Sequence, residues 1–266
     1  LMGSAYSLKL DKIDRSALRV MLGLRKYICS QFKPNVAKAL YDLFKAKNIM
    51  DFSMGWGDRL AGFFASQNTE LYVGVDPRKE NHPIYREQAD YYEGQLTMFE
   101  TMKKVDFYCE AAEDFYYDGY EDTFDIIFTS PPYFNVERYS HDDNQSWVRY
   151  KDIDNWNTQF LQKALDNMLP TLRSGGKLCI NISDVYSPSA GKKAWSKICD
   201  PMNDFIDEYT DMEYKGCIGM EMAKRPNSGG AGTAKDTKQY TEESLQLAKE
   251  TKNKRFCEPI WIWEKK

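Results

Sequence analysis

Seven short apolar runs, most of them separated by segments with helical periodicity, constrain the fold of this chain more than any other feature. They occupy residues 48–53, 71–76, 105–110, 124–130, 176–183, 214–220 and 258–264. Strands that alternate with helices form parallel β-α-β units, and strands buried on both faces of a sheet are typically continuous apolar runs. The sequence therefore predicts an α/β fold in which helices cover both faces of a mostly parallel sheet.

Helical periodicity is strongest in four segments. Two precede the first apolar run, over about 11–32 and 34–46, and Pro34 suits the first turn of the second. The other two cover about 156–172, with Gly175 and Gly176 just beyond as the expected end of the helix, and about 193–209. Because no internal repeat is present, we expect a single domain over residues 1–266.

The composition narrows the classes of function. Of the 266 residues, 42% are apolar, which is enough for a packed core, and no apolar run is long enough to span a membrane. The six cysteines include no C-x-x-C pair, and only two histidines are present, so we expect no metal centre. Several cysteines lie within apolar runs, which is typical of thiols in a reducing compartment.

Charge is distributed unevenly along the chain. The formal net charge is −4, but residues 224–255 carry eight Lys or Arg against four Asp or Glu, so this segment is +4 and the remainder is −8. The segment lies between the last two apolar runs and begins rich in Gly, Ser, Lys and Thr, which indicates an inserted loop. It is either a solvated surface loop or a basic surface that contacts phosphates, with Lys224 and Arg225 as candidate contacts.

A loop with two glycines follows the first apolar run, in the sequence DFSMGWGDRLAGFFA. Gly55 and Gly57 come between the predicted strand end at Asp51 and a helical pattern, where glycines allow a tight turn and close approach to a ligand. Asp76 ends the next run about 20 residues later, the distance at which a carboxylate can accept hydrogen bonds from both hydroxyls of an adenosine ribose. Each feature alone fits an ordinary turn, but together they favour a nucleoside site. Glu110, which ends the third run, is a weaker candidate for contact with an adenine edge.

The fourth apolar run stops at the sequence TSPPYF. Pro131 and Pro132 cannot donate to a sheet ladder and have a fixed φ, so the loop is rigid and its carbonyl groups can face a ligand. The carboxyl ends of parallel strands meet at one edge of a sheet, so Ser130 and Tyr133 are expected to lie beside the glycine-containing loop. A stiff strand exit is the plainer interpretation of Pro-Pro, but Ser, Tyr and Phe134 around it favour a binding site.

In this order the motifs resemble those of DNA amino-methyltransferases, which use S-adenosylmethionine. TSPPYF is similar to their catalytic loop, DFSMGWG to their cofactor loop, and FKPNVAKALYDLF to the segment that helps to hold the methionine end of the cofactor. The resemblance covers roughly residues 30–185 and 258–264. It implies a Rossmann-like seven-stranded methyltransferase sheet, mostly parallel with an antiparallel last strand, and S-adenosyl-L-methionine as the cofactor.

The resemblance also implies roles for individual residues. Those for the cofactor are Pro34, Asp51, Ser53, Gly55, Gly57, Asp76, Glu110 and Ala111. Those for catalysis are Ser130, Pro131, Pro132 and Tyr133, and those for substrate contact are Phe134, Asn181, Lys224 and Arg225. The implied partner is duplex DNA with a flipped base, with either a recognition subunit or a homodimer left open and no membrane contact. The implied location is the cytoplasm, in a bacterium or in the host cell of a phage or virus.

The expected chemistry is methyl transfer to an exocyclic base amine, which is a poor nucleophile because its lone pair is delocalised into the ring. The Ser130 hydroxyl and the Pro131 carbonyl are expected to hydrogen-bond the amine, and the Tyr133 ring is expected to stack on the flipped base. In the resembled family, serine at the first loop position goes more often with cytosine N4 than with adenine N6, so the resemblance implies cytosine N4 as the acceptor. The alternatives are adenine N6, an RNA base or protein amide as acceptor, and a non-catalytic cofactor-binding subunit.

Overall fold

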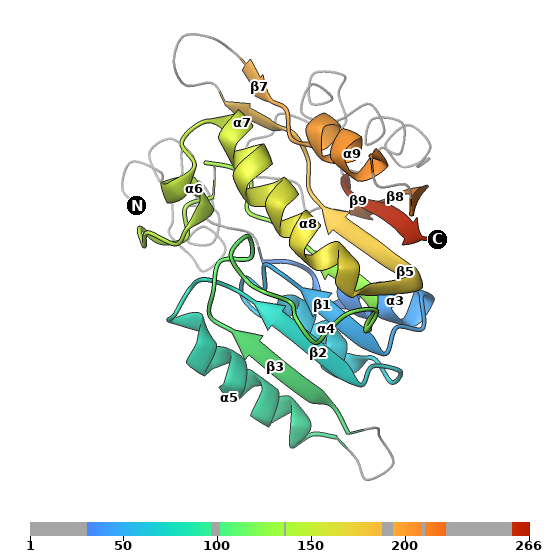
Figure 1. Cartoon of the computed structure of the whole chain (residues 1–266). Coiled ribbons are helices and arrows are strands. Elements are labelled where there is room, and N and C mark those ends of the chain that lie inside the picture. Colours follow the sequence, from blue (N-terminus) through green and yellow to red (C-terminus); the bar gives the residue numbers. More distant parts are fainter. Residues whose placement is uncertain (1–30, 97–101, 136, 188–193, 209–210, 222–256) are drawn as a thin grey trace, which may run out of the picture.

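A seven-stranded sheet forms the centre of the structure, and helices lie against both of its faces (Figure 1). This computed structural model describes residues 31–96, 102–135, 137–187, 194–208, 211–221 and 257–266. Nearly all of the predicted helix over 11–32 falls outside these ranges, as does the basic insert over 224–255 with Lys224 and Arg225. What the sequence predicts for both segments stays a prediction.

The seven strands correspond one by one to the predicted apolar runs. They are β1 (Asn48–Asp51), β2 (Leu71–Val75), β3 (Lys104–Tyr108), β4 (Phe124–Thr129), β5 (Leu172–Asn181), β8 (Met212–Glu221) and β9 (Cys257–Lys265). Their order in the sheet is β3-β2-β1-β4-β5-β9-β8. The last strand, β9, is antiparallel to both neighbours, and the pairings from β3 to β5 are parallel. The predicted sheet is therefore confirmed.

Successive strand residues point to opposite faces of the sheet, and each face carries its own apolar cluster. On one face Ile49 packs in a cluster covered by α3 (Pro34–Leu43), α4 (Asp58–Ala65) and α5 (Asn81–Glu93). We call this the α3 face.

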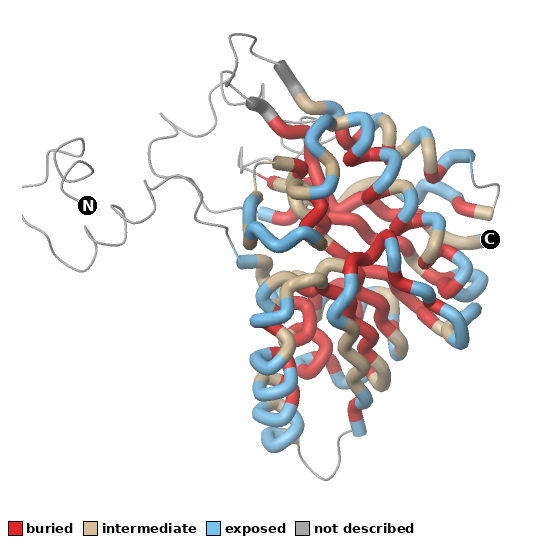
Figure 2. Tube along the Cα trace, turned by 60° about the vertical axis from the view of Figure 1, so that its left-hand side comes forward, coloured by how far each residue is buried: buried red, intermediate tan, exposed pale blue. Residues whose placement is uncertain are grey.

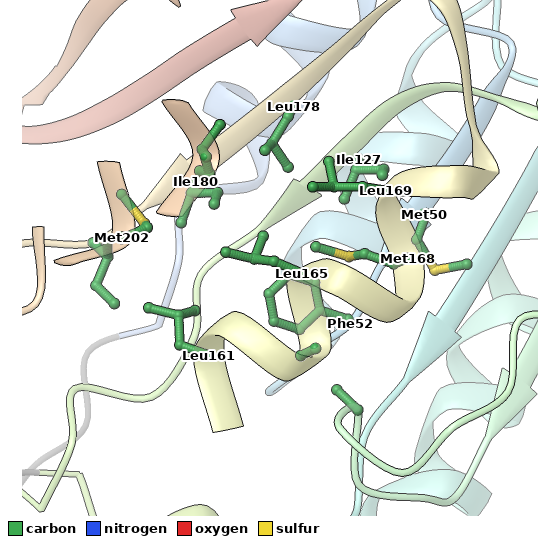
Figure 3. Close-up of a cluster of buried hydrophobic side chains, with 14 of the residues drawn as sticks. Met50, Phe52, Ile127, Leu161, Leu165, Met168, Leu169, Leu178, Ile180 and Met202 are labelled. Carbon is green, nitrogen blue, oxygen red and sulfur yellow. The ribbon is translucent and has the colours of Figure 1, made fainter. Parts of the chain in front are cut away.

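On the opposite face, Met50 packs in a cluster covered by the π-helix η1 (Trp156–Gln162), α8 (Lys163–Met168) and α9 (Cys199–Asp207). We call this the α8 face, and Figure 3 shows its cluster from close by. Figure 2 shows the buried interior between helices whose outer sides are exposed. Helices cover both faces, as the sequence predicts.

Shorter elements complete the described part of the chain. They are α6 (Ser146–Arg149), α7 (Ile153–Asn155), the 3₁₀ helix η2 (Leu169–Thr171), and the two strands of an antiparallel ribbon, β6 (Val185–Ser187) and β7 (Ala194–Ser196). None of the helices in this part is long and apolar enough to cross a membrane.

The helix that precedes β5 ends where the sequence predicts, but the strand begins earlier. Helical structure stops at Thr171, within one residue of the predicted end, and β5 begins at Leu172 instead of residue 176, because Leu172 already pairs with Phe124 of β4. The two glycines lie inside β5, where Gly175 has a φ of 76°. The predicted helix over 193–209 is shorter than expected, since β7 takes its first residues and α9 begins at Cys199.

Close contact between α3 and α4 fixes how α3 sits above the sheet. A Cβ atom on Gly62 of α4 would lie 2.6 Å from the Ala37 Cβ and 2.8 Å from the Pro34 carbonyl oxygen. Only glycine allows this approach. As a result, the FKP segment at the start of α3 is held against the helix that follows the glycine-containing loop.

Candidate active site

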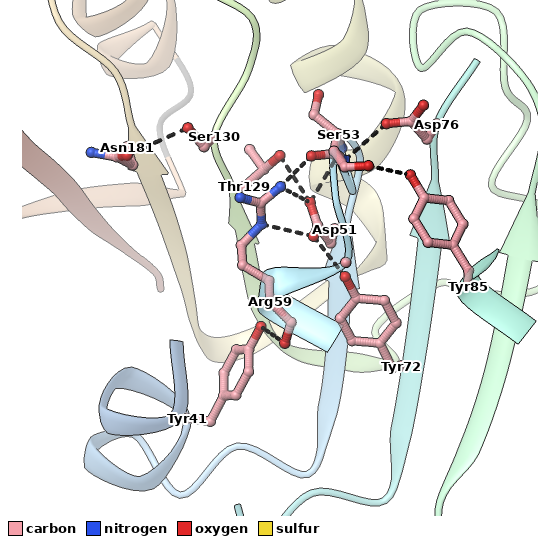
Figure 4. A network of polar contacts seen from close by, with 12 residues as sticks. Tyr41, Asp51, Ser53, Arg59, Tyr72, Asp76, Tyr85, Thr129, Ser130 and Asn181 are labelled. Carbon is pink, nitrogen blue, oxygen red and sulfur yellow. Dashed lines mark hydrogen bonds and ion pairs between the residues drawn. The ribbon is translucent and has the colours of Figure 1, made fainter. Parts of the chain in front are cut away.

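Four strands bring predicted site residues to the same edge of the sheet. Asp51 ends β1, Asp76 follows β2, Ser130 follows β4 and Asn181 ends β5 (Figure 4). These strands are parallel, so their carboxyl ends form one continuous edge. The predicted cofactor and acceptor residues therefore meet where the sequence places them.

Asp51 is the buried centre of a polar network. Its carboxylate accepts hydrogen bonds from Arg59 Nε at 2.7 Å, from the Tyr72 hydroxyl at 2.6 Å and from Thr129 Oγ1 at 3.1 Å. The Ser53 amide donates to it as well, at 3.2 Å. Because both carboxylate oxygens already have protein donors, Asp51 holds β1, β4 and α4 together beneath the loop.

The Asp51–Arg59 ion pair is almost completely buried, with side-chain exposures of 0% and 4%. Burial lowers the pKa of the Arg59 guanidinium, but the adjacent Asp51 carboxylate raises it by more. Burial, followed by the same carboxylate, raises the pKa of Tyr72. The Arg59 guanidinium therefore stays protonated beside Asp51. Arg59 was not singled out by the sequence, where it is one charged residue in an amphipathic helix.

The glycine-containing loop turns through two left-handed residues. Gly55 has a φ of 61°, and its carbonyl accepts hydrogen bonds from the Tyr85 hydroxyl at 2.6 Å and from Asn81 Nδ2 at 2.8 Å. Gly57 has a φ of 81°, and a Cβ there would lie 2.2 Å from Gln88 Oε1. In contrast, the space around a Cβ on Gly55 is open, with the nearest atom 3.9 Å away. The loop thus leaves room at Gly55 for a ligand.

Asp76 lies across this loop from β2. Its Oδ2 accepts a hydrogen bond from the Gly55 amide at 2.9 Å, and its Oδ1 accepts one from the Arg78 amide at 3.0 Å. Burial raises the pKa of Asp76 to about 6 although both amides oppose this shift. A desolvated carboxylate beside an open, left-handed glycine fits the ribose of a nucleoside cofactor.

The other predicted cofactor residues lie at the margins of this arrangement. Glu110 is exposed two residues beyond the end of β3, while Ala111 is buried and begins a turn. The Asp76 amide donates to the Tyr108 carbonyl at 3.1 Å, which keeps the ends of β2 and β3 together. Pro34 is exposed at the start of α3, and Phe32 just before it packs edge-on against Phe128 of β4.

The catalytic-loop candidate begins with a short relay of polar groups. Ser130 Oγ donates to Asn181 Oδ1 at 3.4 Å, and Asn181 Nδ2 donates to the Pro259 carbonyl of β9 at 2.9 Å. The Pro259 carbonyl can only accept, so it fixes the amide orientation of Asn181 with the oxygen toward Ser130. Three strands thus position the Ser130 hydroxyl.

Tyr133 is held by a hydrogen bond from its backbone amide and by the packing of its ring. Its amide donates to Glu137 Oε2 at 3.2 Å. Its ring packs against the apolar cluster of the α8 face, and its hydroxyl is buried without a hydrogen-bond partner among the described residues. Burial, followed by the Glu258 and Glu137 carboxylates, raises the pKa of this hydroxyl.

Phe134 differs from the expectation of substrate contact. It has a φ of 45°, which is unusual for a residue with a side chain, and its ring is only 6% exposed. The ring packs edge-on against Trp156 at a centroid distance of 6.0 Å. This turn directs Phe134 into the core, so the structure assigns it to holding the loop instead of contacting substrate.

The segment after the catalytic-loop candidate folds back over the cofactor side. Tyr139 packs edge-on against Trp56 of the glycine-containing loop at 6.1 Å, and Asn144 Nδ2 donates to the Pro77 carbonyl at 2.8 Å. The sequence left open whether this segment covers a ligand or is an ordinary surface loop. No periodicity or motif identifies these contacts, because they join residues far apart in the chain.

The fold and this edge define the chain as an S-adenosylmethionine-dependent methyltransferase. Residues 124–265, more than half of the chain, match the N6 and N4 methyltransferase family described as DNA methylase. The chain therefore belongs to this family, whose methyl donor is S-adenosylmethionine. The residues around Asp76 and Gly55 fit that cofactor.

Two solved structures show the same fold at low sequence identity. The protein PH0851 is 12% identical, with a TM-score of 0.52 over 90% of this chain and 47% of its own. The methyltransferase domain of bacterial CtHen1 is 10% identical, with a TM-score of 0.50 over 87% of this chain and 96% of its own. No curated protein sequence matches the chain.

Proposed function

We propose that this chain transfers the methyl group of S-adenosylmethionine to the exocyclic amine of a flipped DNA base, with cytosine N4 as the preferred acceptor. One observation carries the proposal. Ser130 lies one residue beyond Thr129, whose hydroxyl binds the same Asp51 that supports the glycine-containing loop. The candidate acceptor group and the cofactor loop are thus joined through a single buried carboxylate.

The hydrogen bonds of Ser130 suit an amine acceptor site. Its hydroxyl donates to Asn181, so its lone pairs face outward and can accept a hydrogen bond from an amine N–H. The Pro131 carbonyl is the second acceptor, held by a residue that cannot join the sheet ladder. Two acceptors on one amine localise its lone pair on nitrogen, which makes the amine a better nucleophile.

The cofactor supplies an electrophilic methyl group at this edge when it is bound. Asp76 would accept hydrogen bonds from the ribose hydroxyls, and the open space at Gly55 would admit the sugar. Tyr133 presents its ring to the flipped base while its hydroxyl end stays buried, and such stacking is worth about 1–3 kcal/mol. The chain then acts by positioning two substrates in line.

In the family that the chain resembles, serine at the position of Ser130 goes more often with cytosine N4 than with adenine N6. This association supports cytosine N4 as the acceptor. We further propose that target recognition uses either a recognition subunit or a homodimer, and that the reaction takes place in the cytoplasm. The basic insert over 224–255 remains the candidate contact with the DNA backbone.

Nucleoside mass spectrometry of DNA from cells that express the chain tests the base. The expected product is N4-methylcytosine, whereas N6-methyladenine would replace the preferred acceptor by the alternative. Purified protein, shown to be folded by its cofactor affinity, is assayed in parallel with labelled cofactor on duplex DNA, unmodified RNA and a release factor. Transfer to RNA or protein alone would contradict the DNA proposal, and transfer to none of the three would support a non-catalytic subunit.

A further inference from the structure

The antiparallel strand β9 brings a carboxylate to the acceptor side of the site. Asn181, the last residue of β5, pairs with Ile260 of β9. Glu258 lies two residues before Ile260, so it extends beyond the end of β5 at the carboxyl edge of the parallel strands. It is partly exposed to solvent.

The side chains of Ser130, Asn181 and Glu258 point to the same face of the sheet. The three residues lie at the ends of the neighbouring strands β4, β5 and β9. Phe128, Cys179 and Ile260 each pack in the cluster of the α3 face. Residues two apart on a strand share a face, which places Ser130, Asn181 and Glu258 on the α3 face as well. Diagonal neighbours on paired strands lie within reach of long side chains.

The backbone next to Glu258 is held by the Ser130 relay itself. Asn181 bridges the Ser130 hydroxyl and the carbonyl of Pro259, the residue that follows Glu258. The Glu258 carboxylate also acts electrostatically on the Tyr133 hydroxyl. Glu258 therefore lies diagonally across from Asn181, the hydrogen-bond partner of Ser130, and its charge reaches the Tyr133 hydroxyl.

Groups from neighbouring elements lie near the start of β9, where Glu258 is placed. The Lys33 ammonium donates to the Glu221 carbonyl on β8, and Glu221 pairs with Cys257 beside Glu258. The Tyr133 amide donates to Glu137 in the loop after β4.

We propose that Glu258 accepts the proton released from the base amine during methyl transfer. This inference rests on the proposed function. The amine nitrogen forms a bond to the methyl carbon as the carbon–sulfur bond breaks, and the electron pair of that bond stays on sulfur as a neutral thioether. The nitrogen then carries a positive charge, and one of its protons passes to the Glu258 carboxylate. Glu258 returns this proton to solvent, to which it is partly exposed.

The Ser130 hydroxyl is a poor proton acceptor, whereas a glutamate carboxylate has an ordinary pKa of about 4.3. The positively charged methylated amine is a strong acid, so a carboxylate is basic enough to take its proton. Ser130 and Pro131 then orient the amine, and Glu258 completes the reaction.

Glu258→Gln tests the proposal, because glutamine keeps the size and hydrogen bonding of glutamate but cannot take the proton. The matched control is Glu264→Gln at the opposite end of the same strand, where Glu264 pairs with Lys177 at 2.5 Å. The kcat of Glu258→Gln is expected to fall about 10²-fold or more, with the KM for cofactor within about twofold of the parent. The control is expected to keep the parent kcat.

The pH profile of kcat at saturating cofactor gives a second readout. The parent enzyme and Glu258→Asp are expected to lose activity at acidic pH, while the residual activity of Glu258→Gln is expected to lack this acidic limb. A Glu258→Gln kcat within about threefold of the parent, with the acidic limb retained, would overturn the proposal.

If Glu258→Gln lost its cofactor affinity through misfolding, Glu258→Ala with added formate decides. Rescue of activity by formate supports Glu258 as the proton acceptor, and no rescue opposes it. A parent protein that methylates no nucleic acid overturns the proposed function and this inference together, and that result is separate from any variant.

Discussion

Burial raises the pKa of Asp76, so we expect the affinity for the cofactor to depend on pH. The carboxylate must be ionised to accept hydrogen bonds from two ribose hydroxyls, and its pKa is raised to about 6. We expect the Kd for S-adenosylmethionine, measured by calorimetry, to rise about tenfold per pH unit below 6 and to be flat above it. A constant Kd between pH 5 and 7.5 would contradict this assignment.

His82 is the necessary control for that experiment, because its Nε2 lies 2.8 Å from the Asp76 backbone carbonyl and its charge lowers the pKa of Asp76. A His82→Gln variant is expected to keep the pH slope, and Asp76→Asn to bind weakly without one. For stability the sign is opposite to that for binding. Since the folded pKa lies above the usual 3.8, Asp76 favours the folded state below about pH 4, and this contribution is lost as the pH rises through about 6.

Ser130 is tested by Ser130→Ala, which removes one amine acceptor and leaves the Asn181 amide in place. The kcat for DNA methylation is expected to fall about 10²–10³-fold, by analogy with loss of one preorganised hydrogen bond, with unchanged cofactor affinity. Ser140→Ala is the matched control, because among the described residues the Ser140 hydroxyl bonds only to Asp142 in its own loop. Rapid-quench single-turnover assays give the chemical step directly.

The Asp51–Arg59 pair predicts a large effect on stability. Arg59→Ala leaves a buried carboxylate without its cation, and the free energy of unfolding is expected to fall by about 3–5 kcal/mol. Lys47→Ala breaks an exposed ion pair with Glu70, which water and salt screen, and is expected to change the free energy of unfolding far less than Arg59→Ala. Urea denaturation of both variants separates the cases, and equal losses would refute a buried ion pair.

At the scale of elements, the contact between α3 and α4 predicts a glycine that tolerates no side chain. Gly62→Ala forces a Cβ to within 3 Å of backbone atoms of α3, so the free energy of unfolding is expected to fall by about 1–3 kcal/mol. Gly94→Ala at the end of α5 has a φ of −65° and only ordinary contacts, so it is expected to be neutral or stabilising by up to about 1 kcal/mol. Thermal unfolding compares the two, and a neutral Gly62→Ala would contradict the close contact.

The strands could be predicted from sequence because each contains a short apolar run, which holds even for the edge strands β3 and β8, where burial is only partial. The β6–β7 ribbon could not, since its strands are three residues each and carry no period long enough to detect. The strand after this helix was expected to begin at residue 176, beyond the glycine turn, but β5 begins at Leu172, which pairs with Phe124. The prediction failed where tertiary contacts overrode local preference.

Site residues show the same division. Gly55, Asp76 and Ser130 could be predicted because they stand where strands end, and parallel strands share that edge. The inward turn of Phe134 depends on a left-handed φ that no motif encodes. Glu258 belongs to the acceptor side only because β9 is antiparallel, so its place follows from the complete sheet order.

At the scale of the whole molecule, the sheet consists of two halves. Strands β1 to β3 carry the predicted cofactor residues and form the donor half, and β4, β5 and β9 carry Ser130, Asn181 and Glu258 and form the acceptor half. The two halves meet between β1 and β4, where the Thr129 hydroxyl donates a hydrogen bond to the Asp51 carboxylate. We therefore expect the residues of the acceptor half to change turnover and those of the donor half to change cofactor affinity.

The position of β9 between β5 and β8 has a consequence for the synthesis of the chain on the ribosome. β5 ends at Asn181 and its partner β9 begins at Cys257, so a ribosome must add some 75 residues before the two can pair. At about 5–20 residues per second, the inner edge of β5 stays uncovered for about 4–15 s on every nascent chain. An uncovered strand edge invites pairing with other chains, so the interval during translation is when this protein is most exposed to aggregation.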